Sequence, residues 1–203
     1  MYRFKKQMWL TAGLLLTLTA CGGGGDTAVT TTATTSGDTV VTTTATTSID
    51  VFDGAAIGCS VSSDGTTATE VGDGAYTFAT VLDAGTVVTA TGCTDTDTQS
   101  LLPALSGVVQ SGAVVISPIT TLIVEAAIAN DVAAKGADLR TSARSISTTA
   151  LQAAIAQIVA NLGLGDYKPT DPATANYVAA AKADTTGTTP AAVVMRMSLA
   201  IST

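Results

Sequence analysis

Residues 67–92, TATEVGDGAYTFATVLDAGTVVTATG, decide the fold. β-Branched and aromatic runs are separated here by Asp73-Gly74 and Ala84-Gly85, pairs suited to positive φ at a tight turn. Apolar and polar side chains alternate in Tyr76-Thr77-Phe78, as in a strand with one buried face. A further turn of the same kind is predicted at Asp64-Gly65. The same alternation of turns and β-branched runs on both sides of this stretch predicts strands at residues 49–52, 57–62, 66–70, 75–80, 86–91 and 113–116. Short strands between regularly spaced turns are typical of an antiparallel sandwich.

Residues 118–203 change to a helical period. Three helix starts carry a capping residue followed by proline: Ser117-Pro118, Asp171-Pro172 and Thr189-Pro190. Thr149 and Gln152 have the spacing of a capping box, and Gly163 or Gly165 ends that helix. The sequence therefore predicts an α+β chain, with a small antiparallel β-sandwich followed by a small alanine-rich helical bundle.

The strand region resembles a known class of module. Its matching residues are Thr67 and Thr69, Asp73-Gly74, Tyr76 and Phe78, Ala84-Gly85, and Val87-Val88. They resemble the core of carboxypeptidase-regulatory-like and Cna-B-like (prealbumin-like) sandwich modules, which implies an Ig- or prealbumin-like domain over residues 49–117. Residues 115–122, VISPITTL, resemble a joint that follows such modules in bacterial surface lipoproteins. Because the last helix has no stop signal before Thr203, we expect the chain to be a shortened version of a longer relative.

Residues 1–20 have the features of a lipoprotein signal peptide. A basic head precedes an apolar run of about a dozen residues, short of the roughly 20 that span a bilayer. Leu18-Thr19-Ala20-Cys21 closes the run and resembles the lipobox of bacterial lipoproteins, which are cleaved before a cysteine that carries acyl chains such as palmitate. The resemblance implies lipidation of Cys21 and, because Gly22 follows it, export to the outer membrane. A transmembrane anchor and an ordinary secretory signal are the alternatives.

Residues 21–48 predict a flexible tether. Four glycines follow Cys21, and a threonine-rich sequence of twelve residues at 26–37 is nearly repeated at 38–49. Such a tract lacks the apolar bulk to form a core, so we expect it to be extended and solvated. The predicted organisation is therefore a signal peptide at 1–20, a lipidated tether at 21–48, a sandwich at 49–117 and a helical domain at 118–203.

The two remaining cysteines, Cys59 and Cys93, form an even pair. In an oxidising compartment the first interpretation of such a pair is a disulfide, which would replace the isopeptide bond of Cna-B modules. Residues 49–117 contain no lysine from which that bond could form. A metal site at the two thiols is the alternative, and no histidine is present among the 203 residues to complete it.

Charge and chemistry narrow the possible functions. Twelve acidic and no basic residues lie between Lys6 and Lys135, which disfavours binding to nucleic acid phosphates. Without histidine, Ser-His-Asp and Cys-His sites are excluded, and we expect no enzyme activity. Asp95 and Asp97 are candidate calcium ligands, and the predicted loops carry three further aspartates that could contribute oxygen ligands: Asp53, Asp64 and Asp73. The alternative is that each aspartate caps its own turn.

These features predict a non-catalytic, membrane-anchored surface lipoprotein with a structural or adhesive role. Its partner would be an envelope or extracellular protein or a glycan, bound by exposed loops and sheet edges. No cofactor is implied beyond the lipid on Cys21. The alternative is a solute- or calcium-binding accessory component of an envelope complex, which a pocket lined by convergent polar groups would favour. A third possibility, an envelope hydrolase, would need a cleft that pairs a lysine with a buried serine.

Overall fold

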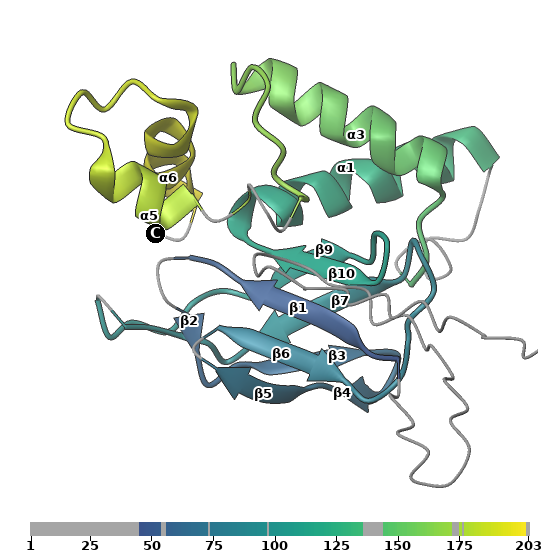
Figure 1. Cartoon of the computed structure of the whole chain (residues 1–203). Coiled ribbons are helices and arrows are strands. Elements are labelled where there is room, and N and C mark those ends of the chain that lie inside the picture. Colours follow the sequence, from purple (N-terminus) through teal and green to yellow (C-terminus); the bar gives the residue numbers. More distant parts are fainter. Residues whose placement is uncertain are drawn as a thin grey trace, which may run out of the picture.

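The computed structural model describes residues 45–53, 56–72, 74–96, 98–135, 144–171, 175 and 177–201. Strands occupy the chain from Thr47 to Ile116, and helices follow from Pro118 (Figure 1). The chain is therefore α+β, as the sequence predicts. The predicted signal peptide, Cys21 and most of the predicted tether lie outside the described residues.

Among the described residues, the β part contains two four-stranded sheets. The first sheet, in spatial order, consists of β10 (Ala113–Ile116), β1 (Thr47–Val51), β6 (Ala75–Phe78) and β5 (Thr69–Gly72). The second sheet consists of β4 (Thr66–Thr67), β3 (Ser60–Ser63), β7 (Val87–Thr91) and β9 (Leu105–Val108). A separate two-stranded ladder pairs β2 (Ala56–Ile57) with β8 (Thr94–Asp95).

One hydrophobic core joins the two sheets. Ile49 of β1 and Phe78 of β6 are buried in the same cluster as Val61 of β3 and Val88 of β7. The alternation seen in Tyr76-Thr77-Phe78 directs Tyr76 and Phe78 into this core, where burying each large ring stabilises the fold by about 1.5–3 kcal/mol. The arrangement is sandwich-like, because two sheets bury their facing sides against each other.

The first sheet is not wholly antiparallel, and here the sequence-based prediction is wrong. β1 and β10 pair in parallel, with Ile49 opposite Val114 and Val51 opposite Ile116. All other described ladders between strands are antiparallel. A parallel pair needs a long crossover connection, and the strands between Val51 and Ala113 supply it.

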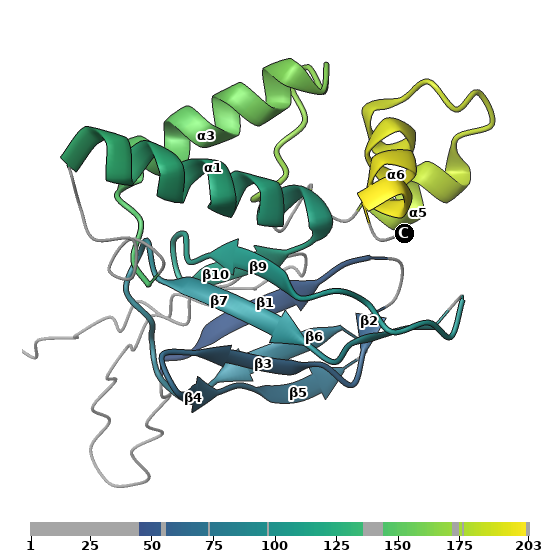
Figure 2. The same cartoon turned by 180° about the vertical axis from the view of Figure 1, so that it is seen from behind.

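The helices cover one side of the sandwich. Their bounds are α1 (Pro118–Lys135), α3 (Thr148–Asn161), α5 (Tyr177–Ala183) and α6 (Pro190–Ile201). Val108 of β9 shares a second hydrophobic core with Ile119 and Ile123 of α1 and Leu151 of α3. Figures 1 and 2 show α1 and α3 on the β9–β10 side, whereas β4 and β5 lie on the opposite side. The helical layer therefore leaves the β3–β4 part of the second sheet uncovered.

Several predicted helix ends are confirmed. The Ser117 hydroxyl accepts a hydrogen bond from the Thr120 amide at 3.2 Å, directly before α1. The Thr189 hydroxyl accepts one from the Ala192 amide at 3.3 Å, before α6. Gly163 follows the end of α3 with a φ of 63°. The predicted start at Asp171-Pro172 includes a proline outside the described residues.

The predicted capping box of Thr149 and Gln152 is wrong. Helix α3 begins at Thr148, and its N-cap is Ser147, whose hydroxyl accepts a hydrogen bond from the Ala150 amide at 3.3 Å. The same hydroxyl donates to the carboxyl group of Asp131, which is buried on α1. One side chain thus caps α3 and connects it to α1, a contact that local sequence spacing does not reveal.

Replacing Ser147 by alanine should lower the free energy of unfolding by about 1–2 kcal/mol, because it removes the cap and the bond to Asp131. The matched control is Thr149→Ala, since Thr149 is exposed in the first turn of α3 and should change stability by less than about 0.5 kcal/mol. Urea unfolding followed by circular dichroism measures both. Equal losses at the two positions would contradict the assignment of Ser147 as the cap.

Candidate functional site

Cys59 and Cys93 are joined in a disulfide, with their Cα atoms 4.1 Å apart. Cys59 directly precedes β3 and Cys93 lies between β7 and β8, so the bond connects the ends of two paired strands. The Cys59 amide also donates a hydrogen bond of 2.9 Å to the hydroxyl of Tyr76, from the first sheet. The disulfide therefore lies where the two sheets are already held together.

Of the two candidate calcium ligands, only Asp95 can be placed. Asp97 lies outside the described residues. The Asp95 carboxylate accepts a hydrogen bond from the Thr98 amide at 3.3 Å, as in a side-chain-capped turn. Within the described ranges, no three His, Cys, Asp or Glu side chains gather in a group that could hold a metal ion.

A row of hydroxyl groups lies on the outer side of β4, β3 and β7 in the second sheet. Its members, here called the hydroxyl face, are Ser60, Ser62, Thr67, Thr89 and Thr91. Ser62 lies opposite both Thr67 of β4 and Thr89 of β7, and Ser60 lies opposite Thr91. Between them along the strands, Val61 and Ala90 point inward and are fully buried. Strand alternation thus places serine and threonine on one side and the core on the other.

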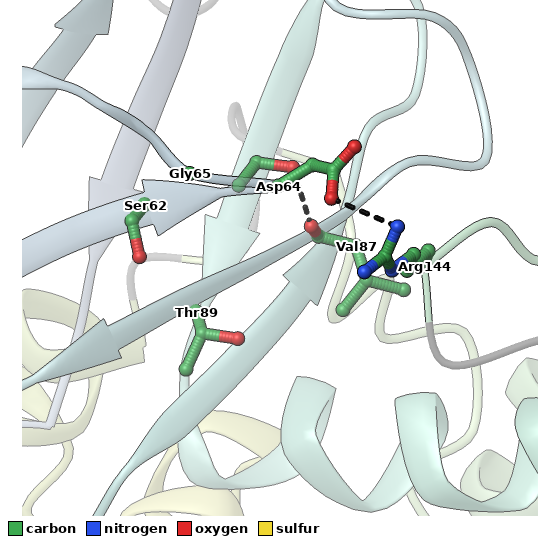
Figure 3. Close-up of a pocket in the computed structure, with 7 residues that line it drawn as sticks. Ser62, Asp64, Gly65, Val87, Thr89 and Arg144 are labelled. Atoms are coloured by element: carbon green, nitrogen blue, oxygen red, sulfur yellow. Dashed lines mark hydrogen bonds and ion pairs between the residues drawn. The ribbon is translucent and has the colours of Figure 1, made fainter. Parts of the chain in front are cut away.

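A groove of about 340 Å³ lies at one end of this face (Figure 3). Seven residues line it: Ser62, Ser63, Asp64, Gly65, Val87, Thr89 and Arg144. All but Arg144 come from β3, β7 or the turn after β3. The groove is open to solvent and mostly polar, unlike the enclosed apolar pockets that bind drug-like molecules.

Local backbone geometry positions the two charged residues. Asp64 and Gly65 form a tight turn with φ values of 44° and 82°, which the Asp-Gly sequence predicts. The backbone of Arg144 is held beside β7, because its carbonyl oxygen accepts a hydrogen bond from the Val87 amide at 3.0 Å. The Ile146 amide donates to the Gly85 carbonyl at 2.8 Å, so residues 144–146 run beside the start of β7.

Some polar groups of the groove are already paired with other groups of the protein, whereas others can bond to a ligand. Asp64 and Arg144 form an ion pair at 3.2 Å, and their side chains are 68% and 72% exposed, so the pair is weak and a ligand can replace either partner. The Ser63 hydroxyl donates to the Val87 carbonyl at 2.8 Å. The hydroxyls of Ser62 and Thr89 make no hydrogen bond within the described parts of the chain. Figure 3 shows that neither bonds to another residue of the groove lining.

Sequence reasoning found only part of this groove. Asp64 is singled out by its turn, and the strands that carry Ser62 and Thr89 are predicted. Arg144 has no local signal, because only the pairing of residues 144–146 with the start of β7 brings it to the second sheet. A contact across more than 50 residues of sequence does not follow from periodicity or capping.

A second polar cluster lies in the loop between α5 and α6. The Asp184 carboxylate accepts hydrogen bonds from the hydroxyls and amides of Thr186 and Thr189. These bonds, with that from the Thr186 hydroxyl the strongest, hold the pKa of the Asp184 carboxyl below its usual value. Arg196 donates to the Gly187 carbonyl at 2.7 Å. The bonds of this cluster are internal to the helical hairpin, which indicates a structural role.

No helix among the described residues is long and apolar enough to cross a membrane. Comparison of the chain with protein-family models, with curated proteins and with solved structures found no match. The candidate site therefore rests on its geometry alone.

Proposed function

We propose that the protein is a non-catalytic lipoprotein of the cell envelope, held at the outer membrane by acyl chains on Cys21. The lipobox Leu18-Thr19-Ala20-Cys21 supports the anchor, and the threonine-rich tether at 21–48 supports presentation away from the membrane. In this proposal residues 49–117 are an Ig- or prealbumin-like sandwich and residues 118–203 a helical domain packed on it. Its role is recognition of an envelope or extracellular partner.

The observation that carries the proposal is the groove with its adjoining hydroxyl face. Ser62 and Thr89 offer free hydroxyls on two paired strands, and Asp64 and Arg144 offer opposite charges at the rim. Groups held on strands keep their relative positions better than groups on loops, which suits a binding surface. The surface is built for hydrogen bonding to a partner.

The same groove argues against catalysis. A serine or threonine nucleophile needs a general base within hydrogen-bond reach, oriented by a third group. The hydroxyls of Ser62 and Thr89 have no such hydrogen bond within the described residues. Asp64, the one carboxylate of the groove, is paired with Arg144 instead. We therefore place this site with binding modules and propose no cofactor other than the lipid.

A second candidate is a solute-binding accessory component of an envelope complex. The groove favours it, because polar groups converge on about 340 Å³, enough for a small polar molecule. The two candidates differ in what occupies the groove: a free solute in one, and part of a larger partner in the other. Binding of small free solutes alone would favour the second candidate.

Lipidation of Cys21 can be tested directly in a Gram-negative host. The full chain should be recovered from the outer membrane, with the mass of residues 21–203 plus acyl chains. Cys21→Ala should abolish both the acyl mass and the cleavage, whereas the tether variant Thr27→Ala should retain both. Intact-mass spectrometry of the purified proteins measures the modification. A wild-type chain without acyl groups would contradict the lipoprotein proposal, and protease treatment of whole cells would show which side of the membrane the sandwich faces.

A further inference from the structure

We infer that the groove binds a neutral saccharide unit, an inference that rests on the proposed recognition function and specifies its partner as a glycan. The first reason is the balance of hydrogen-bonding groups. Asp64 only accepts, Arg144 only donates, and the hydroxyls of Ser62 and Thr89 do either. A sugar ring carries neighbouring hydroxyls that donate and accept, so one ring can satisfy all four groups.

The second reason is that other classes of partner would bind this groove less favourably. An apolar peptide would bury the Ser62 and Thr89 hydroxyls without replacing their bonds to water, which is costly. Only Val87 offers an apolar side chain in the lining. A polyanion would gain a single cation, Arg144, and meet Asp64 beside it. A neutral, hydroxyl-rich ligand has neither penalty.

The third reason is the path out of the groove. The hydroxyl face continues from Ser62 to Thr67 on one neighbouring strand and to Thr89 on the other, with strands about 4.8 Å apart. Ser60 and Thr91 form a second, exposed pair on the same face. Further units of a glycan chain can therefore lie along this face, on the side of the sandwich that the helices leave open (Figure 2).

The affinity for a single chain should be low. The groove is open and its lining holds no aromatic ring on which a sugar could stack, so hydrogen bonds in competition with water supply most of the energy. We expect a Kd on the order of 1 mM for a hexasaccharide. Many copies on one membrane would bind a repeating polymer far more tightly, because the later contacts become intramolecular.

The test uses the full acylated chain, labelled with ¹⁵N and held in a detergent that is not a glycoside. Cellohexaose, maltohexaose, chitohexaose and mannohexaose are titrated to about 20 mM, well above the expected Kd. At least one should shift the amide signals of Ser62, Thr89 and Arg144 in a saturable manner. A sulfated heparin hexasaccharide serves as the anionic comparison.

Three variants make the result specific. Thr89→Val keeps the shape and strand propensity but removes the hydroxyl, and should raise the Kd at least fivefold. Arg144→Gln should do the same, whereas Arg196→Gln makes the same charge change on α6 and should leave the Kd within twofold. Dispersed amide spectra confirm that each variant is folded.

Three outcomes would overturn the inference. They are no saturable shift at the groove with any of the four neutral sugars, binding of the sulfated hexasaccharide alone, and unchanged affinity in both Thr89→Val and Arg144→Gln. Each of these leaves the lipid anchor standing, because that is decided by the mass of the Cys21 product. Conversely, if the chain binds a saccharide but carries no acyl groups, the proposed lipid anchor is contradicted and the proposed saccharide site is supported.

Discussion

Replacing Gly107 by alanine is expected to lower the free energy of unfolding by about 3 kcal/mol, which a domain of marginal stability can barely tolerate. A Cβ at this position would overlap the carbonyl oxygen of Val115 and lie 2.9 Å from a methyl carbon of Val114. Most of the atoms that the new Cβ would meet belong to the backbone, which cannot rotate away as a flexible side chain can. β9 and β10 would have to separate where the two sheets meet.

Gly72→Ala is the matched control for this prediction. Gly72 also lies in a strand, but its Cβ would meet nothing closer than the Cβ of Ala75 at 4.0 Å. Alanine there should be neutral or stabilise by a few tenths of a kcal/mol, because it restricts the unfolded chain. Urea unfolding of both variants gives the comparison. Similar midpoints for Gly107→Ala and the wild type would show that β9 and β10 do not approach as closely as described.

The same glycine explains one strand that the sequence did not predict. Glycine weakens a strand pattern, so Leu105-Ser106-Gly107-Val108 gives little local signal for β9. In the structure the glycine is what allows β9 to cross close to β10. The feature that hides the strand from sequence analysis is thus a requirement of its packing.

Predictions were successful where the signal is local. The Asp64-Gly65 turn has the positive φ values that its sequence predicts, and Tyr76 and Phe78 are buried as their alternation implies. The parallel pairing of β1 with β10 could not be predicted in this way. Its partners lie at opposite ends of the strand region, and turn residues carry no information about such pairs.

The N-cap of α3 shows how tertiary contacts choose among equivalent local signals. Ser147, Thr148 and Thr149 are consecutive, and each can cap a helix. Only Ser147 also reaches the buried carboxyl group of Asp131 on α1. The groove follows the same logic, since Arg144 joins it through backbone pairing with Val87 rather than through any motif.

Replacing both Cys59 and Cys93 by alanine is expected to lower the free energy of unfolding by about 4 kcal/mol, more than the change expected for Gly107→Ala. The cysteines are 34 residues apart in sequence. In the chain-entropy model, a bond that closes a loop of this length lowers the conformational entropy of the unfolded chain, and this accounts for a stabilisation of about 4 kcal/mol. Cys93 is fully buried, so alanine is preferred to serine, whose hydroxyl would be desolvated.

The native structure should survive this change. The loss of stability would then come from the greater freedom of the unfolded chain, and not from lost contacts in the folded protein. β3 and β7 remain paired from Ser60–Thr91 to Ser62–Thr89, and the Tyr76 hydroxyl still accepts a hydrogen bond from the backbone amide of residue 59. Circular dichroism without urea should therefore be unchanged. The urea midpoint should fall and the m value should rise, because the uncrosslinked chain exposes more surface when it unfolds. Reductant should reproduce both changes in the wild type and have no effect on the double variant. A wild-type midpoint that is insensitive to reductant would show that the bond contributes nothing to stability.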